Sequence, residues 1–249
     1  MSLFSSNNPA LKEKAFAEVA GTEVLDSASV MTLQGTIAKS ALMLALVAVA
    51  AMFAWDLLLV TGQPLPFLIA SLLVALGLAF WISFKKHLAK YIAPVYCILQ
   101  GLVLGSISGI MELSYPGIAS QAMLLTFTVF GSMLLLYSTR VIRATERFKS
   151  IVLTATFGIM CYYLIAWVMM LFGAEVALLH STGTAGIVFS LLVVAIAALN
   201  LIIDFDTIEK GVEYGAPKYM EWYAAFGLTV TLIWLYIEIL RLLSKISRR

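Results

Sequence analysis

Seven long apolar stretches, separated by short polar connections, make up most of the chain. They cover residues 37–60, 66–84, 91–111, 117–139, 151–172, 183–203 and 219–243. Each is close to the ~20 apolar residues that a helix needs to cross a hydrocarbon layer. No sustained alternation of polar and apolar positions predicts β-strands. The pattern predicts an all-α membrane protein, folded as a bundle of seven transmembrane helices.

The residues before the first apolar stretch are polar or mixed and lack the apolar core of a signal peptide. We expect residues 1–36 to form a cytoplasmic N-terminal segment and residues 37–249 to form the transmembrane domain. Asn8 and Pro9, ahead of residues 10–18, are typical of the N-cap and first turn of a short surface helix.

The composition excludes several classes of protein. Hydrophobic residues make up 62% of the chain and charged residues 12%, with a mean hydropathy of +0.99. Soluble proteins carry ~25% charged residues, so an ordinary soluble domain is excluded and a lipid bilayer is the expected surrounding. With a net charge of +2 and no large basic patch, no nucleic-acid partner is expected. Glycines 101, 105 and 109 recur every four residues, a spacing that lets helices pack closely.

The lysine and arginine positions predict the orientation, because cytoplasmic loops are enriched in both. With the N-terminus in the cytoplasm, twelve of the sixteen basic residues lie on the inner side and the three outer loops carry none. The remaining four, from Arg241 onward, follow the last stretch and would lie outside. We predict seven full crossings despite this conflict, because residues 219–243 are long enough to span.

Three acids, Asp56, Glu112 and Glu175, fall at the predicted outer ends of helices or in outer loops, with no basic residue beside them. They are either solvated loop carboxylates or an outer acidic mouth whose negative potential concentrates cations.

The inner end of the sixth stretch carries Asp204, Asp206, Glu209 and Lys210, followed by Gly211. Residues i and i+2 on a helix point ~200° apart, so we expect only one of the two aspartates to face the bundle interior. In one alternative both are interfacial and the helix ends at Gly211. In the other, a buried carboxylate acts as a proton-dependent latch.

Glu238 lies well inside the last apolar stretch. Arg241, three residues later, shares its helix face and can pair with it. Two interpretations of Glu238 remain open: a structural Glu–Arg pair near the outer interface, and a cation or proton site inside the bundle.

No motif points to catalysis. The chain has no HExxH sequence, no GxSxG sequence and no Walker-type loop, and its two histidines are expected on opposite sides of the membrane. We therefore expect neither an enzyme nor a bound cofactor or metal.

Several short motifs, in this order and spacing, resemble a bacterial branch of the Bax inhibitor-1 family. They are MTLQGTIAK at 31–39, YPGI at 115–118, DFDTIEK at 204–210, EWYAAFG at 221–227 and WLYIEILRLL at 234–243. The resemblance implies that six helices surround the last one, in a multi-pass protein of a bacterial inner membrane. It also implies pH-sensitive calcium leak as an activity, with calcium or other cations as the transported partner.

In calcium-leak members of that family, one aspartate on the sixth helix and one on the seventh form a proton-sharing latch beside an arginine of the second helix. Asp206 matches the first position best, with Asp204 the near alternative, but the second position falls at Thr231. The closest acid on that helix, Glu238, lies seven residues further, about 10.5 Å along the axis. Residues 66–84 contain no arginine.

Two functions follow as hypotheses. The first is a pH-sensitive calcium or cation leak, with Asp206, Asp204 and Glu238 as the cation or proton site. The second is an interaction protein without transport activity, which regulates a membrane-bound protease or stress-response complex through residues 1–39.

Overall fold

The computed structural model describes residues 30–248 except 62–64 and 174–182, so the predicted helix at 10–18 lies outside the described residues. The helices are α2 (Leu33–Thr61), α3 (Leu65–Phe84), the 3₁₀ turn η3 (Lys86–Leu88), α4 (Ala89–Ser114), α5 (Ile118–Ser138), α6 (Glu146–Leu171), α8 (Thr184–Glu213) and α9 (Met220–Ser247). The prediction of an all-α bundle with seven long helices is confirmed.

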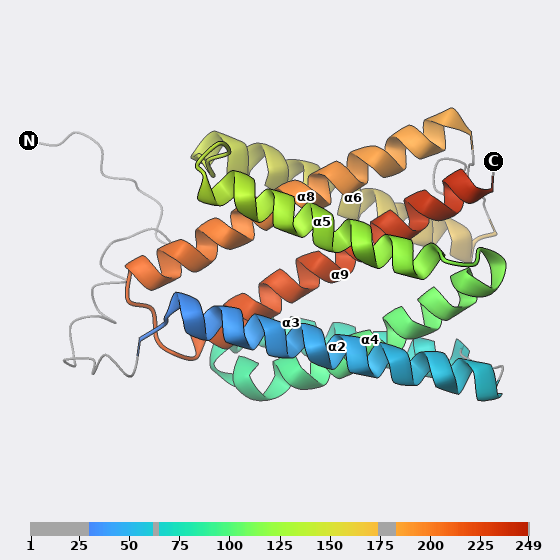
Figure 1. Cartoon of the computed structure of the whole chain (residues 1–249), viewed down its shortest axis with the longest axis horizontal. Helices are drawn as coiled ribbons and strands as arrows, with labels where there is room; N and C mark the ends of the chain where they lie inside the picture. The colour runs from blue at the N-terminus through green and yellow to red at the C-terminus, as the bar shows by residue number, and fades with distance from the viewer. Residues whose placement is uncertain (1–29, 62–64, 174–182, 249) are drawn as a thin grey trace, which may run out of the picture.

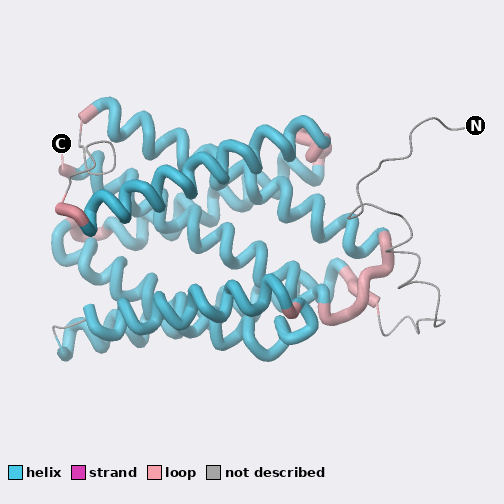
Figure 2. Tube along the Cα trace, turned by 180° about the vertical axis from the view of Figure 1, so that it is seen from behind, coloured by secondary structure: helices cyan, strands magenta, loops and turns pink. Residues whose placement is uncertain are grey.

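The long helices run alternately in opposite directions, side by side (Figures 1 and 2). Six of them are long and apolar enough to cross a membrane, and the apolar part of α3, Leu68–Phe84, is shorter. The chain is therefore a multi-pass membrane protein. We call the end of the bundle where α2, α4, α6 and α9 begin the N-side, and the opposite end the C-side. The last residues of α9 lie at the C-side, away from the start of α2 (Figure 1).

Helix α9 occupies the centre of the bundle. It packs directly against α2, α4, α5 and α8, while α6 reaches it through the side chain of Tyr163 and α3 packs on α4. Leu235 of α9 belongs to an apolar cluster shared with α8, and Ile233 of α9 belongs to a second cluster shared with α2, α3 and α4. Opposite faces of α9 therefore join the two halves of the apolar core.

Glycine allows α2 and α4 to approach closely. A Cβ at Gly105 would overlap the backbone carbonyl of Ala51, and a Cβ at Gly101 would lie 2.6 Å from the Cβ of Ala50. A larger residue at either position would therefore force α2 and α4 apart, and the close approach agrees with the four-residue glycine spacing.

The C-terminal boundary of α8 differs from the expectation. The apolar pattern ended at residue 203, and one alternative closed the helix at Gly211, but α8 continues to Glu213 and a left-handed Gly215 (φ +62°) follows. The reason is that ion pairs stabilise the polar end of the helix. Lys210 pairs with Asp206 one turn earlier, while Lys149 of α6 and Arg140 of the α5–α6 turn pair with Asp206 and Glu209. The acidic segment is thus helical throughout.

Candidate functional site

Asp204 lies where α8 meets α9. Leu201 and Phe205, on either side of it, are buried in the core, and the Asp204 carboxylate faces the hydroxyl of Thr231 on α9. Its Oδ2 atom is shielded from solvent, and no donor among the described residues hydrogen-bonds to it. A shielded carboxylate oxygen without a donor is uncommon and needs an explanation. Asp204 therefore offers an open oxygen ligand inside the bundle.

Asp206 points to the other side of α8. Its carboxylate, 13% exposed, lies 2.7 Å from the Nζ of Lys149 on α6 and 3.0 Å from the Nζ of Lys210. The two aspartates point to different sides of α8, as their spacing predicts, and Asp206 meets Lys149 of α6 instead of an open surface. Helix α8 lies between α9 and the α5–α6 pair, so side chains ~200° apart both meet protein. Asp206 is a carboxylate neutralised by two cations.

Glu209 connects α8 to the turn between α5 and α6. It accepts hydrogen bonds from the Tyr137 hydroxyl and the Arg140 guanidinium. Arg140 adopts a left-handed backbone (φ +59°), which is strained for a non-glycine residue. The hydrogen bond to Glu209 raises the pKa of Arg140 above its usual value, so the guanidinium stays charged. Sequence reasoning missed this contact, although the basic run after residue 139 signalled an acidic partner.

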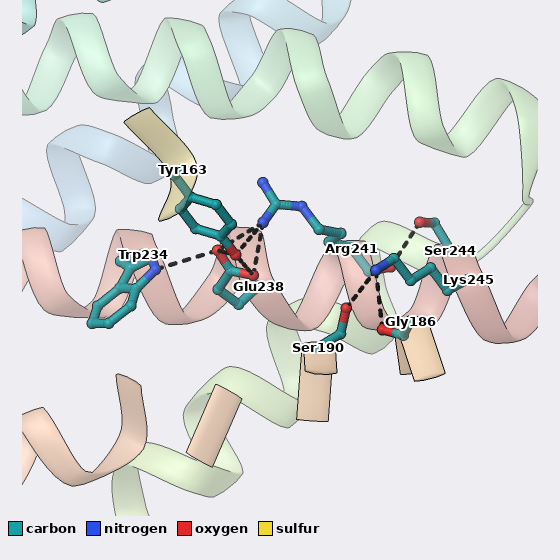
Figure 3. Close-up of polar contacts among 8 residues, drawn as sticks. All are labelled: Tyr163, Gly186, Ser190, Trp234, Glu238, Arg241, Ser244 and Lys245. Carbon is teal, nitrogen blue, oxygen red and sulfur yellow. Dashed lines mark hydrogen bonds and ion pairs between the residues drawn. The ribbon is translucent and has the colours of Figure 1, made fainter. Parts of the chain in front are cut away.

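Glu238 is held in a polar cluster between α9 and α6 (Figure 3). Its oxygens accept hydrogen bonds from the Tyr163 hydroxyl at 3.0 Å, the Trp234 indole at 3.3 Å and the Arg241 guanidinium at 2.9 Å. Arg241 also stacks over the Tyr163 ring at 5.0 Å. The predicted ion pair between Glu238 and Arg241 is confirmed. Both oxygens of Glu238 are already occupied.

Lys245 extends this polar group toward α8. It is buried, and its Nζ donates to the Ser190 hydroxyl at 2.8 Å and to the Gly186 carbonyl at 3.1 Å (Figure 3). Sequence reasoning placed Lys245 in an external tail. Its position four residues after Arg241, on the same helix face, was the available signal that it turns inward.

The predicted outer acids have different surroundings. Glu112 accepts hydrogen bonds from the backbone N–H groups of Gly117 and Ala119, at the first turn of α5. It therefore stabilises a helix N-terminus. Asp56 is exposed on α2 at the C-side, and Glu175 lies outside the described residues.

Glu221 is a buried acid that sequence reasoning did not select. At the start of α9, it accepts hydrogen bonds from the N–H and hydroxyl of Thr32 and pairs with Lys39. A Cβ at Gly35 would overlap its carboxylate. The motif at 31–39 and the residue at 221 therefore build one contact between α2 and α9. Within the described part of the chain, no three His, Cys, Asp or Glu side chains gather as metal ligands.

The comparisons with known proteins give one match. A family model described as Bax inhibitor 1 like matches residues 5–248, almost the whole chain. Neither the search of curated proteins nor the search of solved structures found a match. The match covers both the Glu221 contact at the start of α9 and the acidic segment of α8. The chain belongs to the Bax inhibitor 1 like family.

Proposed function

We propose that this protein conducts cations, with calcium as the favoured ion, passively across a membrane, and that conduction rises with pH. The protein acts without enzymatic chemistry and without a resident cofactor. The observation that carries the proposal is the Oδ2 atom of Asp204, a shielded oxygen without a donor between α8 and α9. Calcium binds oxygen ligands, and intramembrane carboxylates mark ion pathways.

The surroundings of Asp204 suit a cation that passes through better than one that is bound tightly. Calcium takes ~6–8 oxygen ligands, and the Thr231 hydroxyl is the polar group that faces Asp204 from α9. Backbone carbonyls and water would have to supply the rest. An incomplete ligand set binds weakly, which conduction requires because the ion must leave as well as enter.

The other two candidate acids carry compensating charges. Lys149 and Lys210 neutralise Asp206, and Arg241 neutralises Glu238. A cation would have to displace a fixed ammonium or guanidinium group at either place. We therefore assign the cation and proton site to Asp204, and the roles of Asp206 and Glu238 are to hold α8 to α6 and α6 to α9.

The proposed direction of the pH response follows from the two states of Asp204. The ionised carboxylate attracts a cation, and both of its oxygens are acceptors. The protonated carboxyl group is neutral and can donate to the Thr231 oxygen, which would tie α8 to α9. Acidification should therefore close the pathway, and alkalinisation should open it.

The proposed location is the inner membrane of a bacterium, with the N-side in the cytoplasm. The N-side carries the basic residues of the two turns that follow α3 and α5, including Lys85, Lys86, Arg140 and Arg143. Basic residues accumulate on the cytoplasmic side of membrane proteins, which supports this orientation.

The test is calcium flux into liposomes that contain the purified protein, at about pH 6 and about pH 8. We expect flux above that of empty liposomes, larger at the higher pH. Asp204→Asn should remove the pH dependence, whereas the matched variant Asp206→Asn should keep it. Flux equal to that of empty liposomes at both pH values would refute conduction, and a pH-independent wild type would refute the role of Asp204.

A second candidate function is interaction with a membrane protease or stress-response complex. The supporting observation is a fixed attachment point at the N-side. The N–H of Met31 donates to the carbonyl of Ala216 at 2.7 Å, and Val30 forms a β-bridge with Pro217. Residues 30 and 31, which precede α2, are thereby attached beside the α8–α9 connection. Deletion of residues 2–26 should abolish pull-down of the partners, and unchanged retention would rule out this role for the segment.

A further inference from the structure

A cavity of about 580 Å³ lies between α2 and α5, on the C-side half of the bundle. Leu44, Ala48 and Ala51 of α2 form one wall, and Met123 and Phe127 of α5 form the other. Side chains of α4 and α9 form the floor. The volume lies within the range of ~300–1,000 Å³ that small-ligand sites occupy.

The cavity faces the hydrocarbon layer. Helices α2 and α5 both pack on α9, but they make almost no contact with each other, so the space between them is open sideways. The α2 wall runs from Leu44 to Asp56, about 18 Å at ~1.5 Å per residue. That length is a little more than half of the ~30 Å hydrocarbon thickness. The groove therefore matches the acyl layer of one leaflet.

The lining of the cavity selects an apolar occupant. The Tyr236 hydroxyl and the Ser108 hydroxyl hydrogen-bond to each other at 2.6 Å. The Thr126 hydroxyl donates to the Ala122 carbonyl at 2.7 Å. Because these polar groups already have partners and the other lining side chains around them are apolar, a polar ligand would lose its hydration without compensation.

The mouth of the cavity differs from its apolar interior because it carries a charge. Asp56, which is exposed, is the only charged residue among those that line the described cavity, and Trp55 lines it next to Asp56. A carboxylate beside an indole is a suitable pair for an ammonium group, through charge attraction and a cation–π contact. Tryptophan also prefers the membrane–water interface, where a headgroup would lie.

We propose that this cavity binds one acyl chain of a lipid with an ammonium headgroup, and that Asp56 and Trp55 hold the headgroup. Specificity must come from the headgroup, since an acyl chain gains little by leaving other acyl chains for an apolar wall. Anionic lipids without an ammonium group should be disfavoured, because Asp56 repels them and the lining residues contain no lysine or arginine. This binding is independent of cation conduction.

The experiment measures lipid bound to the full-length protein. The protein is equilibrated in vesicles of phosphatidylethanolamine and phosphatidylglycerol in equal amounts, extracted in mild detergent and examined by native mass spectrometry. We expect one retained lipid, with phosphatidylethanolamine preferred by about tenfold. Asp56→Asn should bring the preference close to equality, whereas Glu146→Gln, an exposed acid at the N-side, should leave it unchanged.

A second pair of variants tests the cavity itself. Ala48→Phe fills the space between α2 and α5 and should abolish retention of the lipid, while Ala70→Phe, exposed on α3, should not. Equal retention of the two lipids by the wild type would overturn the proposal, as would unchanged retention by Ala48→Phe. The proposal would also be overturned if the wild type were a dimer without retained lipid and Ala48→Phe dissociated that dimer. The occupant of the cavity would then be a second copy of the chain. Failure of conduction in liposomes would leave this result unaffected.

Discussion

Removal of Arg241 should destabilise the protein more than removal of its partner Glu238. The two side chains form an ion pair at 2.9 Å, but their surroundings differ: the Glu238 side chain is 2% exposed and that of Arg241 is 32% exposed. In Arg241→Met, the carboxylate stays buried with two neutral donors, from Tyr163 and Trp234. In Glu238→Leu, the guanidinium can extend toward the C-side surface and keep its contact with the Tyr163 ring.

The magnitudes follow from these two states. Isolating one member of a buried ion pair costs about 3–5 kcal/mol, and this is the loss we expect for Arg241→Met. Glu238→Leu should cost about 1–2 kcal/mol, the usual loss when a hydrogen-bonded group keeps partial access to solvent. The double variant removes both charges, so its free energy of unfolding should lie within about 1–2 kcal/mol of the wild type.

The assay is reversible unfolding in mixed micelles with increasing SDS, followed by circular dichroism. Arg143→Met is the control, because Arg143 is exposed and forms no ion pair within the described residues. Its effect should stay within about 0.5 kcal/mol. A loss for Arg241→Met no larger than that for Glu238→Leu would refute the difference in burial as its cause, and so would losses that simply add in the double variant.

Two further predictions use the same unfolding assay. Gly105→Ala should lower the free energy of unfolding by about 1–3 kcal/mol, because the new Cβ would overlap the Ala51 carbonyl. Gly131→Ala, with nothing within 4 Å of its Cβ, should raise it by up to ~1 kcal/mol. Equal effects of the two variants would contradict the close contact of α2 with α4. Lys149→Met should cost about 1–3 kcal/mol, since Asp206 keeps only Lys210, and the loss should disappear when Asp206→Asn is added. A loss that persists in the double variant would show that Lys149 stabilises α6 by other means.

The sequence predicted the helices to within a few residues at most ends, because the length of an apolar run is set by the membrane. The exception is α8, where the apolar run ended at residue 203 but the helix continues to Glu213. Hydropathy measures transfer into lipid, whereas the last turns of α8 are held by ion pairs between α8, α6 and the α5–α6 turn. Those partners, Lys149 and Arg140, come from distant positions that no local pattern connects to α8.

The candidate site was predictable as a set of acids but not as a set of contacts. Periodicity correctly placed Arg241 beside Glu238, since both lie on one helix. It could not indicate that Tyr163 of α6 completes that cluster, nor which aspartate of α8 faces α9, because both depend on how the helices are rotated in the bundle. The family pattern pointed to Asp206, whereas the residue that faces Thr231 is Asp204.

The acids of this bundle differ chiefly in their donors, and this difference separates structural roles from the proposed conducting one. Glu221, Glu209 and Asp206 each pair with a cation from another segment of the bundle. Glu238 pairs with Arg241 of its own helix and is joined to α6 by the Tyr163 hydroxyl. An acid that a fixed cation neutralises cannot attract a mobile ion without breaking the contact that holds the helices together. Asp204 faces a hydroxyl instead, so a proton or a passing cation can change its charge without removing an ion pair. A bundle braced by four neutralised acids can therefore stay assembled while the fifth changes state.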